Sequence, residues 1–310
     1  MRLSELGEFG LLGELERRGL VQRIENDAAR FAPDLVVTQD ALVEGIHFRL
    51  DWTSWRDLGY KAAAVNVSDL AASGAEPEAL IVSLGLPGET EANDVVELYE
   101  GIAEAGVPVL GGDTTAADRL YLSVTALGRA GRVPGRDGAR PGDLLVVTGP
   151  LGASGAGFHC LKEGFESPLV SSHLRPPMRV AEGKELARSA HAMLDISDGL
   201  ASDALRIAER SHCRPVIELE RVPVADGVAE IARQFDLDVY ALACGFGEDY
   251  ELLAAVPEPG RFTVIGRCEE GEGVLFLRDG EPLELAGWEH FRDEPGSACE
   301  SSKRNPQSQR

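Results

Sequence analysis

The sequence is poor in the features that mark secreted, membrane-spanning and zinc-binding proteins. Its five cysteines, at positions 160, 213, 244, 268 and 299, are odd in number and show no Cys-X-X-Cys spacing, which favours a reducing cytoplasm. No stretch approaches the roughly 18 apolar residues of a membrane span. The first residues mix Glu and Arg with Leu, unlike a signal peptide. No cluster of His and Cys suggests zinc. We therefore expect a cytoplasmic protein without a membrane segment.

Positive charge is also scarce. Lys and Arg total 30 against 52 Asp and Glu, so the formal net charge is −22. This balance argues against nucleic acids and anionic membranes as partners. It suits cationic ligands and divalent metals, although most of the acids should be plain solvated surface.

A Gly-X-X-X-X-Gly-Lys-Ser/Thr loop is missing, and the glycine-rich stretch 149–157 has no Lys. We expect that stretch to be a turn between a strand and a helix.

Strand and helix patterns follow one another through both halves of the chain. Its 310 residues, 44% of them hydrophobic, suffice for two domains. Strands are predicted at 35–38, 79–86, 107–110, 120–127, 144–148, 216–219, 251–256 and 262–266, and helices at 3–18, 66–75, 91–105, 180–190 and 199–210. The segment 132–143 is rich in Gly, Pro and Arg and is the expected junction. The prediction is an α/β (α+β) chain with domains 1–138 and 139–294 and a disordered tail at 295–310.

Asp69 is notable because its neighbours offer no counter-charge. It lies among small residues, a pattern typical of the inner face of a packed helix. A carboxylate buried there costs on the order of several kcal/mol unless a cation faces it. No Lys or Arg occurs between Ala62 and Pro87. Either a metal or a distant cation balances Asp69, or Asp69 is a solvated or helix-capping residue, and the pattern alone leaves these alternatives open.

Single Asp residues recur where predicted strands end or helices begin, at positions 27, 40, 69, 113, 195 and 198. In the segment 195–199, Asp195 and Asp198 flank a Ser before a predicted helix, whose free N–H groups favour anions. Converging oxygen ligands suit Mg²⁺, which prefers carboxylates, water and phosphates. The same spacing is compatible with Asp198 as a helix N-cap and Asp195 as a turn residue at a strand end.

Five motifs, in this order, resemble those of the thiamine-monophosphate kinases, a family in the superfamily of aminoimidazole ribonucleotide synthetase. The resemblance runs from Gly7 to Phe291, and the motifs are DALVEGIHF at 40–48, NVSDLAA at 66–72, GGDTT at 111–115, DISDGL at 195–200 and GEDYEL at 247–252. It implies ATP-dependent phosphorylation of thiamine phosphate to thiamine diphosphate, the final step of thiamine diphosphate biosynthesis, by direct in-line transfer with several Mg²⁺ ions. It also implies a two-domain fold whose N-terminal domains pair strands in a homodimer.

The resemblance further implies roles for individual residues. The magnesium ligands would be Asp27, Thr38, Gln39, Asp40, Asp69, Asp113, Asp195 and Asp198. ATP would contact Gly112, Asp113, Arg136 and Ser197. Thiamine phosphate would contact His47, Glu248 and Trp288. Apart from the resemblance, Arg136 is compatible with an ordinary surface residue, His47 with a packed histidine and Trp288 with a core residue.

Two substitutions depart from the family's pattern and bear on the number of metal ions. The family's Gly-Asp-Asp near the N-terminus reads Glu25-Asn26-Asp27 here, so the first carboxylate has become an amide. Gln39 stands where the family often has Thr. Both changes concern the number of metal ions, and the reaction that the resemblance implies stays the same.

The implied chemistry needs no general base, and none stands out. The acceptor phosphate has a second pKa of about 6 and is largely ionised at neutral pH. The difficulty is to bring two polyanions into line, and Mg²⁺ and Arg136 would offset their charge. An aromatic face such as Trp288 would hold the thiazolium or the pyrimidine, worth about 1–2 kcal/mol, with Glu248 balancing the charge or accepting hydrogen bonds.

Two other functions stay open at this point. One is a different ATP-using enzyme of the same superfamily. A selenophosphate synthetase usually has a reactive Cys or selenocysteine near its N-terminus, whereas the first Cys here is Cys160. A hydrogenase-maturation dehydratase has a C-terminal Cys tail, which the surroundings of Cys299 do not resemble. The other function is a non-catalytic nucleotide- or metal-binding regulator, suggested by Asn26 and Gln39.

Overall fold

The computed structural model describes residues 3–21 and 26–288. The chain divides into a large unit, residues 23–288, and a small unit made of residues 1–22 and 289–310. In the small unit, helix α1 (Leu3–Arg17) is interrupted at Gly7, whose φ of 71° and ψ of 174° are not helical. The helix predicted at 3–18 is therefore present, with a break at Gly7. The predicted tail at 295–310 lies outside the described residues.

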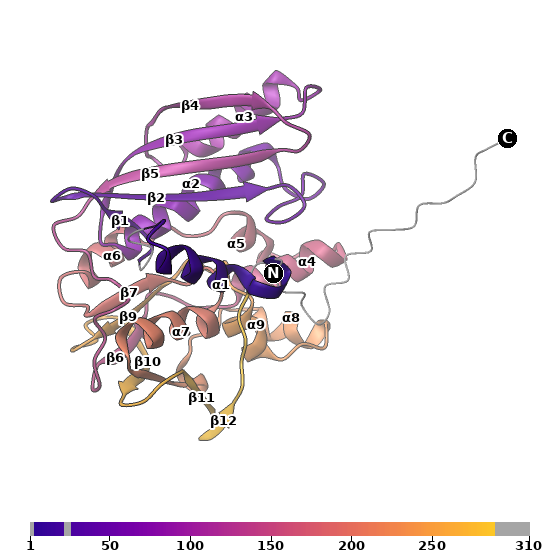
Figure 1. The fold of residues 1–310 in the computed structure, drawn as a ribbon. Helices are drawn as coiled ribbons and strands as arrows, with labels where there is room; N and C mark the ends of the chain where they lie inside the picture. Colours follow the sequence, from indigo (N-terminus) through magenta and orange to yellow (C-terminus); the bar gives the residue numbers. More distant parts are fainter. Residues whose placement is uncertain (1–2, 22–25, 289–310) are drawn as a thin grey trace. The chain divides into compact units, whose positions relative to one another are not determined.

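The first sheet of the large unit has five strands in the order β1-β2-β5-β3-β4 (Figure 1). Their bounds are Ala29–Arg30 for β1, Leu35–Val43 for β2, Glu76–Leu86 for β3, Val109–Ala116 for β4 and Tyr121–Arg129 for β5. Neighbours pair antiparallel except β3 and β4, which are parallel. Helices α2 (Trp55–Ala72) and α3 (Ala92–Ala103) bury their apolar residues against one face of this sheet. Burial of that face on a single side gives the strands their alternating pattern.

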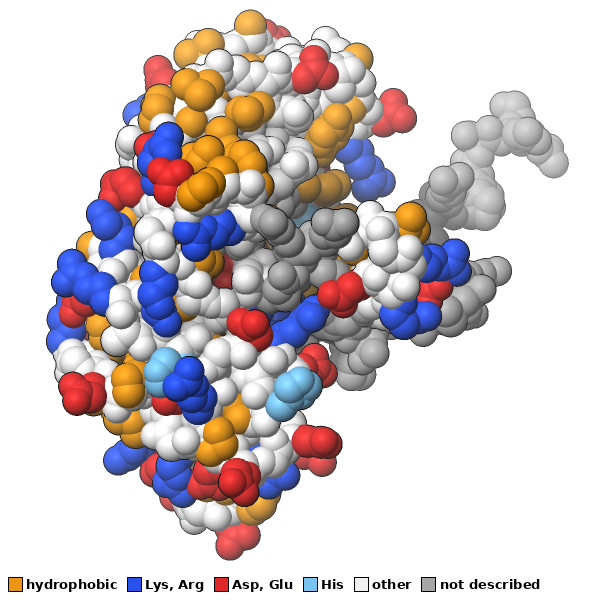
Figure 2. Space-filling view, turned by 60° about the vertical axis from the view of Figure 1, so that its left-hand side comes forward, with side chains coloured by type: hydrophobic (Ala, Val, Ile, Leu, Met, Phe, Trp, Pro, Cys, Tyr) orange, Lys and Arg blue, Asp and Glu red, His pale blue; other side chains and the backbone are white. Residues whose placement is uncertain are grey.

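The other face of the first sheet carries exposed apolar side chains. Ile81 on β3 is 39% exposed, and Leu110 on the edge strand β4 is 70% exposed. In the upper part of Figure 2, where the first sheet lies, several hydrophobic side chains gather on the surface. An exposed edge strand with an apolar face is a surface suited to pairing with another chain.

The second sheet has seven strands in the order β12-β11-β8-β10-β6-β9-β7. Their bounds are Leu144–Val147 for β6, Ala192–Asp195 for β7, Arg214–Glu218 for β8, Leu252–Val256 for β9, Thr263–Glu269 for β10, Leu275–Arg278 for β11 and Glu281–Leu283 for β12. The helices of this half are α4 (Ala153–Glu163), α5 (Val170–Leu174), α6 (Val180–Leu186), α7 (Leu200–Ser211), α8 (Val228–Gln234) and α9 (Val239–Gly245), with a 3₁₀ turn at Leu219–Arg221. Strands β7 and β9 are buried along their whole length, as expected for strands covered on both faces.

Helix α2 joins the two sheets. Its Leu58, Ala62 and Val67 belong to the core of the first sheet, whereas Ala71 and Ala72 pack with residues of the second. Small side chains at the C-terminal end of α2 let the second sheet approach closely. The helix is therefore the element through which both halves reach a common site.

The two-sheet α/β architecture confirms the predicted fold class. The predicted boundary between residues 138 and 139 falls in the stretch between β5 and β6, and the domain limits stay a prediction. Among the described residues, no helix combines the length and apolar character that crossing a membrane requires.

Three elements differ from the prediction at positions that matter for the site. Strand β2 continues to Val43, so Asp40 lies within it, paired with Val124. The motif 111–115 lies inside strand β4 and not in a turn after it. Gly112 allows this because a Cβ at its position would lie 1.7 Å from the carbonyl oxygen of Val82 on β3. Helix α4 begins at Ala153, so half of the glycine-rich stretch is helical.

Candidate metal and phosphate site

Three carboxylates that are far apart in the sequence meet in the structure. Ligand oxygens of Asp27, Asp69 and Asp195 all lie within 4.8 Å of one another. Asp27 precedes β1, Asp69 lies in the last turn of α2, and Asp195 ends β7. Asp195 is buried. We call these three residues the Asp cluster. It brings together three of the eight predicted metal ligands, from both halves of the chain.

The electrostatics of the Asp cluster favour a bound cation. Burial raises the pKa of Asp69 well above its usual range, and the charges of Asp40, Asp195 and Asp27 raise it further. Burial also raises the pKa of Asp195, followed by the charge of Asp27. Acids that repel one another in a buried place are stabilised by a cation among them. An all-oxygen ligand set of this kind fits Mg²⁺.

The polar residues around Asp69 each hold a different part of the site. Asn66 Oδ1 accepts a hydrogen bond of 3.0 Å from the backbone N–H of Asp40. Ser68 Oγ donates one of 2.6 Å to Asp195. Thr38 Oγ1 donates to Asp69. The segment 66–69 therefore fixes strand β2, strand β7 and the Asp cluster together. Thr38, predicted as a ligand, contacts a carboxylate of the cluster.

Arg136 reaches the Asp cluster from the segment between the two sheets. Its guanidinium forms an ion pair with Asp27. Burial opposes the charge of Arg136, but Asp27 outweighs this effect and raises the pKa of the guanidinium above its usual range. Among the described residues, Arg136 Nε finds no hydrogen-bond acceptor. A buried, charged donor of this kind suits a phosphate oxygen. The interpretation of Arg136 as an ordinary surface residue is wrong, because its side chain is 15% exposed.

Asn26, which replaces an acid of the family pattern, has a defined contact. Its Oδ1 accepts a hydrogen bond of 3.0 Å from the backbone N–H of Arg136. A carboxylate would accept the same bond, so the amide keeps the backbone contact and loses only the charge. The substitution therefore leaves the position of Arg136 intact.

Asp198 and its neighbours do not join the Asp cluster. The Asp198 carboxylate pairs with Arg206, and its N–H donates a 3.1 Å hydrogen bond to Asp203. Burial and the charge of Asp198 raise the pKa of Asp203 to about 8, against the opposing effect of Arg206. The alternative in which Asp198 caps α7 is wrong, because Gly199 holds the cap position. Ser197 is tied through its carbonyl oxygen, which accepts a hydrogen bond of 2.8 Å from Glu248 N–H.

Gln39 and Asp113 lie on the opposite side of the first sheet from the Asp cluster. Side chains alternate along β2, so Gln39 points away from the face that carries Thr38 and Asp40. Its Nε2 donates a hydrogen bond of 2.8 Å to Ser123. Asp113 is in register with Ser83 on β3 and is exposed. The metal-ligand roles of Gln39 and Asp113 stay a prediction, because within one chain the alternation of side chains along β2 turns Gln39 away from the Asp cluster.

The predicted acceptor contacts lie around Glu248. Lys61 Nζ and His173 Nδ1 each approach the Glu248 carboxylate to 3.2 Å. Burial would raise the pKa of Glu248, but the charge of Lys61 is the main effect that outweighs it and lowers that pKa below its usual range, and His47 acts in the same direction. The backbone N–H of Trp288 donates a hydrogen bond of 2.9 Å to the carbonyl oxygen of Asp198.

The alternative interpretations of Trp288 as a core residue and of His47 as a packed histidine have different outcomes. Trp288 is 37% exposed, so the interpretation of this residue as core is wrong. His47 is partly buried, and its Nδ1 accepts a hydrogen bond of 3.1 Å from Val43 N–H. That contact fixes the ring of His47 in the loop after β2. The charge of His47 acts on Glu248, which places the two residues in one neighbourhood.

The motif 247–252 also has structural duties. Asp249 accepts hydrogen bonds from the N–H groups of Gly152 and Ser154, at 2.7 and 3.1 Å. These groups begin helix α4, so a protein carboxylate already fills the anion position at its N-terminus. Glu251 pairs with Arg179. Asp249 thus occupies the place where a phosphate-binding loop would hold its anion. This agrees with the absence of a Lys from the glycine-rich stretch 149–157.

Sequence reasoning missed four residues of this region: Lys61, Ser68, Asp203 and Arg206. Lys61 carried a signal, since it lies seven residues before Ser68 and so on the same face of α2. Buried lysines are rare without a partner, and that partner, Glu248, is 187 residues away. Only the fold reveals the pair.

Comparisons with known proteins cover both halves of the chain. Residues 25–130 match the family described as AIR synthase related protein, N-terminal domain, and residues 140–277 match its C-terminal domain. The chain is 37% identical to the thiamine-monophosphate kinase of Aquifex aeolicus, over 94% of this chain and 100% of that protein. It is 37% identical to the enzyme of the same name from Escherichia coli K12, over 83% of this chain and 86% of that protein.

Solved structures show the same likeness. The structure described as "AaThiL complexed with AMPPCP and TMP" has a TM-score of 0.87 and 37% identity, and the match covers 94% of this chain and 99% of that one. The hydrogenase maturation protein HypE of E. coli has a TM-score of 0.67 at 21% identity, over 93% and 97% of the two chains. The second likeness concerns the fold alone.

Proposed function

Because this chain belongs to the thiamine-monophosphate kinase family, we propose that it transfers the terminal phosphate of ATP to thiamine phosphate and forms thiamine diphosphate. The observation that carries the proposal is the Asp cluster, with the buried Arg136 beside it. A relative of known structure at 37% identity was solved with AMPPCP and TMP, which supports a nucleotide and a second phosphorylated ligand. The likeness to HypE is weaker, so the alternative of another superfamily activity has less support.

Divalent metal is part of this proposal. Asp27, Asp69 and Asp195 would hold Mg²⁺. The charge of Asp40 acts on both Asp69 and Asp195, whereas that of Asp198 acts on Asp203. When bound, the ions neutralise the negative charge of the two phosphorylated substrates. Thr38 and Ser68 orient the carboxylates through their hydroxyl hydrogen bonds, and such supporting contacts fix the ligands of a metal.

The chain's own residues contribute binding, orientation and charge. Arg136 offers its free Nε–H to a phosphate oxygen of ATP, where it stabilises charge in the transition state. The acceptor phosphate is already ionised near neutral pH, so no side chain needs to remove a proton. Glu248, His47 and Trp288 would hold the heterocyclic end of thiamine phosphate, Glu248 as an anion facing the thiazolium or the aminopyrimidine.

A second copy of the chain completes the proposed site. Gly112, Asp113 and Gln39 belong to the part of the first sheet whose outer face carries exposed apolar side chains. Pairing of two such sheets in a homodimer would bury Ile81 and Leu110. It would also carry Asp113 of one copy toward the site of the other, where it would serve as a ligand for metal and ATP.

We place the enzyme in the cytoplasm. The four cysteines within the described residues are free and buried, as suits a reducing compartment.

A turnover assay tests the proposal. Purified protein is incubated with ATP, Mg²⁺ and thiamine phosphate, and thiamine diphosphate and ADP are quantified. We expect equal amounts of both products, none without Mg²⁺, and none when free thiamine replaces thiamine phosphate. A folded protein that binds both substrates but forms no product would overturn the kinase assignment and favour the regulator.

A further inference from the structure

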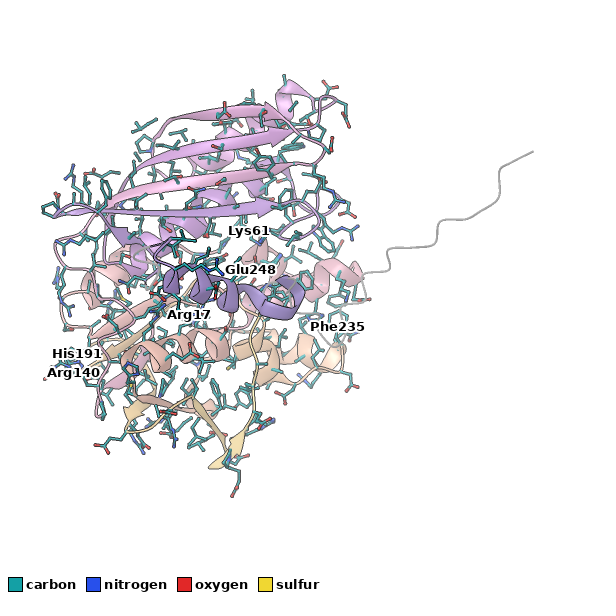
Figure 3. All side chains as sticks on the ribbon, viewed as in Figure 1. Arg17, Lys61, Arg140, His191, Phe235 and Glu248 are labelled. Atoms are coloured by element: carbon teal, nitrogen blue, oxygen red, sulfur yellow. The ribbon has the colours of Figure 1, made fainter. Side chains whose placement is uncertain are left out.

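Lys61 is a buried cation in an apolar setting. It lies on α2 and is 1% exposed. Its Nζ lies 3.2 Å from both carboxylate oxygens of Glu248 (Figure 3). Nothing in the Asp cluster uses this ammonium group. A buried Lys is retained only when a specific partner offsets its desolvation, and here that partner is a residue proposed to bind the acceptor.

Glu248 is more exposed than the two residues that contact its carboxylate, Lys61 and His173. The side chains of Lys61 and His173 are 2% and 6% exposed, whereas that of Glu248 is 23% exposed. His173 Nδ1 also lies 3.0 Å from Ser154 Oγ. The partners therefore lie behind Glu248, and part of its carboxylate faces outward. Lys61 is too deeply buried to touch a substrate itself.

The backbone fixes Glu248 as well. Its φ is 56°, a left-handed conformation that is costly for a residue other than glycine. Its N–H donates a hydrogen bond of 2.8 Å to the carbonyl oxygen of Ser197. The loop is thereby tied to the segment that carries Asp195, so the carboxylate of Glu248 and the Asp cluster share one rigid frame.

Helix α2 sets the separation between the two ends of the site. Lys61 and Ser68 lie two turns apart on one face, a rise of about 10 Å along the helix axis. Ser68 holds Asp195, and Lys61 holds Glu248. One small molecule with a phosphate at one end and a heterocyclic cation at the other spans such a distance.

We propose that Lys61 is a positioning residue for the acceptor, which holds Glu248 as a fixed anion that pairs with the heterocyclic cation of thiamine phosphate. The inference rests on the proposed function and deepens it. Without Lys61, the carboxylate turns outward to water or takes up a proton, and either change weakens its hold on the cation. The nucleotide end of the site does not depend on this pair.

A double-mutant cycle tests the inference. The variants are Lys61→Met, Glu248→Gln and both together, and Lys184→Met is the control because Lys184 pairs with Glu76 on the surface. Each is assayed for its KM for thiamine phosphate and its KM for ATP, and thiamine phosphate binding is measured by calorimetry in the presence of AMPPCP. We expect both single variants to raise the thiamine phosphate KM about tenfold or more while the KM for ATP stays unchanged.

The decisive readout is the coupling between the two positions. If Lys61 acts through Glu248, Lys61→Met adds nothing in the Glu248→Gln background. Additive effects, or an equal rise in the KM for ATP, overturn the inference. Should Lys61→Met fail to fold because Glu248 loses its partner, the double variant has no unpaired charge, and its comparison with Glu248→Gln decides. Weaker binding by the double variant overturns the inference, and equal binding supports it.

The same experiment separates this inference from the proposed function. Turnover by the parent protein with additive mutational effects overturns the role of Lys61 alone. Coupled binding effects without turnover overturn the kinase reaction alone. A parent protein that does not bind thiamine phosphate overturns both.

Discussion

Ser68 donates a hydrogen bond of 2.6 Å to Asp195, a residue 127 positions later in the chain. The bond joins helix α2, which covers the first sheet, to the end of β7 in the second. Asp69, the next residue of α2, completes the Asp cluster with Asp195 and Asp27. The site therefore exists only when the two halves are packed together, and α2 transmits that packing directly to the carboxylates.

Replacement of Ser68 by Ala tests this link. The change leaves Asp195 buried without its hydroxyl donor, so we expect a loss of about 1–3 kcal/mol in the free energy of unfolding. The affinity for Mg²⁺ should fall about 10- to 100-fold, since an orienting contact is lost. Thermal unfolding with and without Mg²⁺ measures both effects. Ser171→Ala, which removes an exposed hydroxyl bonded to Pro168, is the control, and equal behaviour of the two variants would contradict the role of Ser68.

Replacement of Asp69 by Asn should have opposite effects on stability and activity. In the absence of metal, Asp69 repels Asp195 and Asp27 at short range, so removal of its charge should raise the melting temperature. With Mg²⁺ present, the variant should lose the stabilisation that the parent protein gains, because one ligand charge is missing. Turnover should fall by orders of magnitude.

The matched control for Asp69→Asn is Asp118→Asn, at an exposed position. It should change neither the melting temperature nor its response to Mg²⁺. An Asp69→Asn variant that is less stable than the parent without metal, yet still stabilised by Mg²⁺, would refute the Asp cluster as the metal site.

Much of the fold follows from local sequence patterns. The alternation of strands and helices in both halves predicts two α/β halves, and the strand bounds near Ala79, Leu120 and Leu144 are close to those observed. The short strands β11 and β12, of which β12 forms the edge of the sheet, and the small helices α8 and α9 were not predicted. Their stability comes from packing against the buried residues of the second half of the chain, and local patterns do not reveal such packing.

The composition of the site was predictable in part. Asp27, Asp69 and Asp195 converge as the motifs imply, because each stands at the end or the start of an element. Gln39 entered the predicted ligand set beside Asp40 through the family resemblance, and the strand was predicted to end at residue 38, five residues before its observed end at Val43. Once the strand is continued to Val43, period two moves Gln39 to the other face. The place of Lys61 on α2 is a local signal, but its pairing with Glu248, 187 residues later in the chain, is not visible in any local pattern.

His173 makes stability sensitive to acid. Burial, followed by the charge of Lys61, lowers the pKa of His173 to about 3, against the opposing charge of Glu248. An unfolded chain binds a proton at this residue below its ordinary pKa of about 6.5, whereas the folded chain does not until about pH 3. The free energy of unfolding should therefore fall as the pH falls through this window, by about 1.4 kcal/mol per pH unit from this residue.

Substitution of His173 by Gln should remove that contribution. Between pH 7 and pH 5 the loss of stability should be smaller than in the parent protein by about 2 kcal/mol. Urea unfolding at the two pH values measures the difference. His212→Asn, at an exposed position, should leave the pH dependence unchanged. An unaltered pH dependence in His173→Gln would mean that folding does not lower the pKa of His173.

Asp113 offers the sharpest test of the proposed dimer. It lies on the outer face of the first sheet, away from the Asp cluster of its own chain. If a second copy places it in the neighbouring site, Asp113→Asn should abolish turnover without changing the Asp cluster.

Two inactive variants, Asp113→Asn and Asp69→Asn, should then restore activity when they are co-folded, because each mixed dimer has one site with both native residues. Random pairing should return about a quarter of the parent activity. A mixture that stays inactive while size-exclusion chromatography shows mixed dimers would mean that Asp113 serves its own chain or no site at all, and a monomeric parent enzyme with full turnover would exclude the shared site.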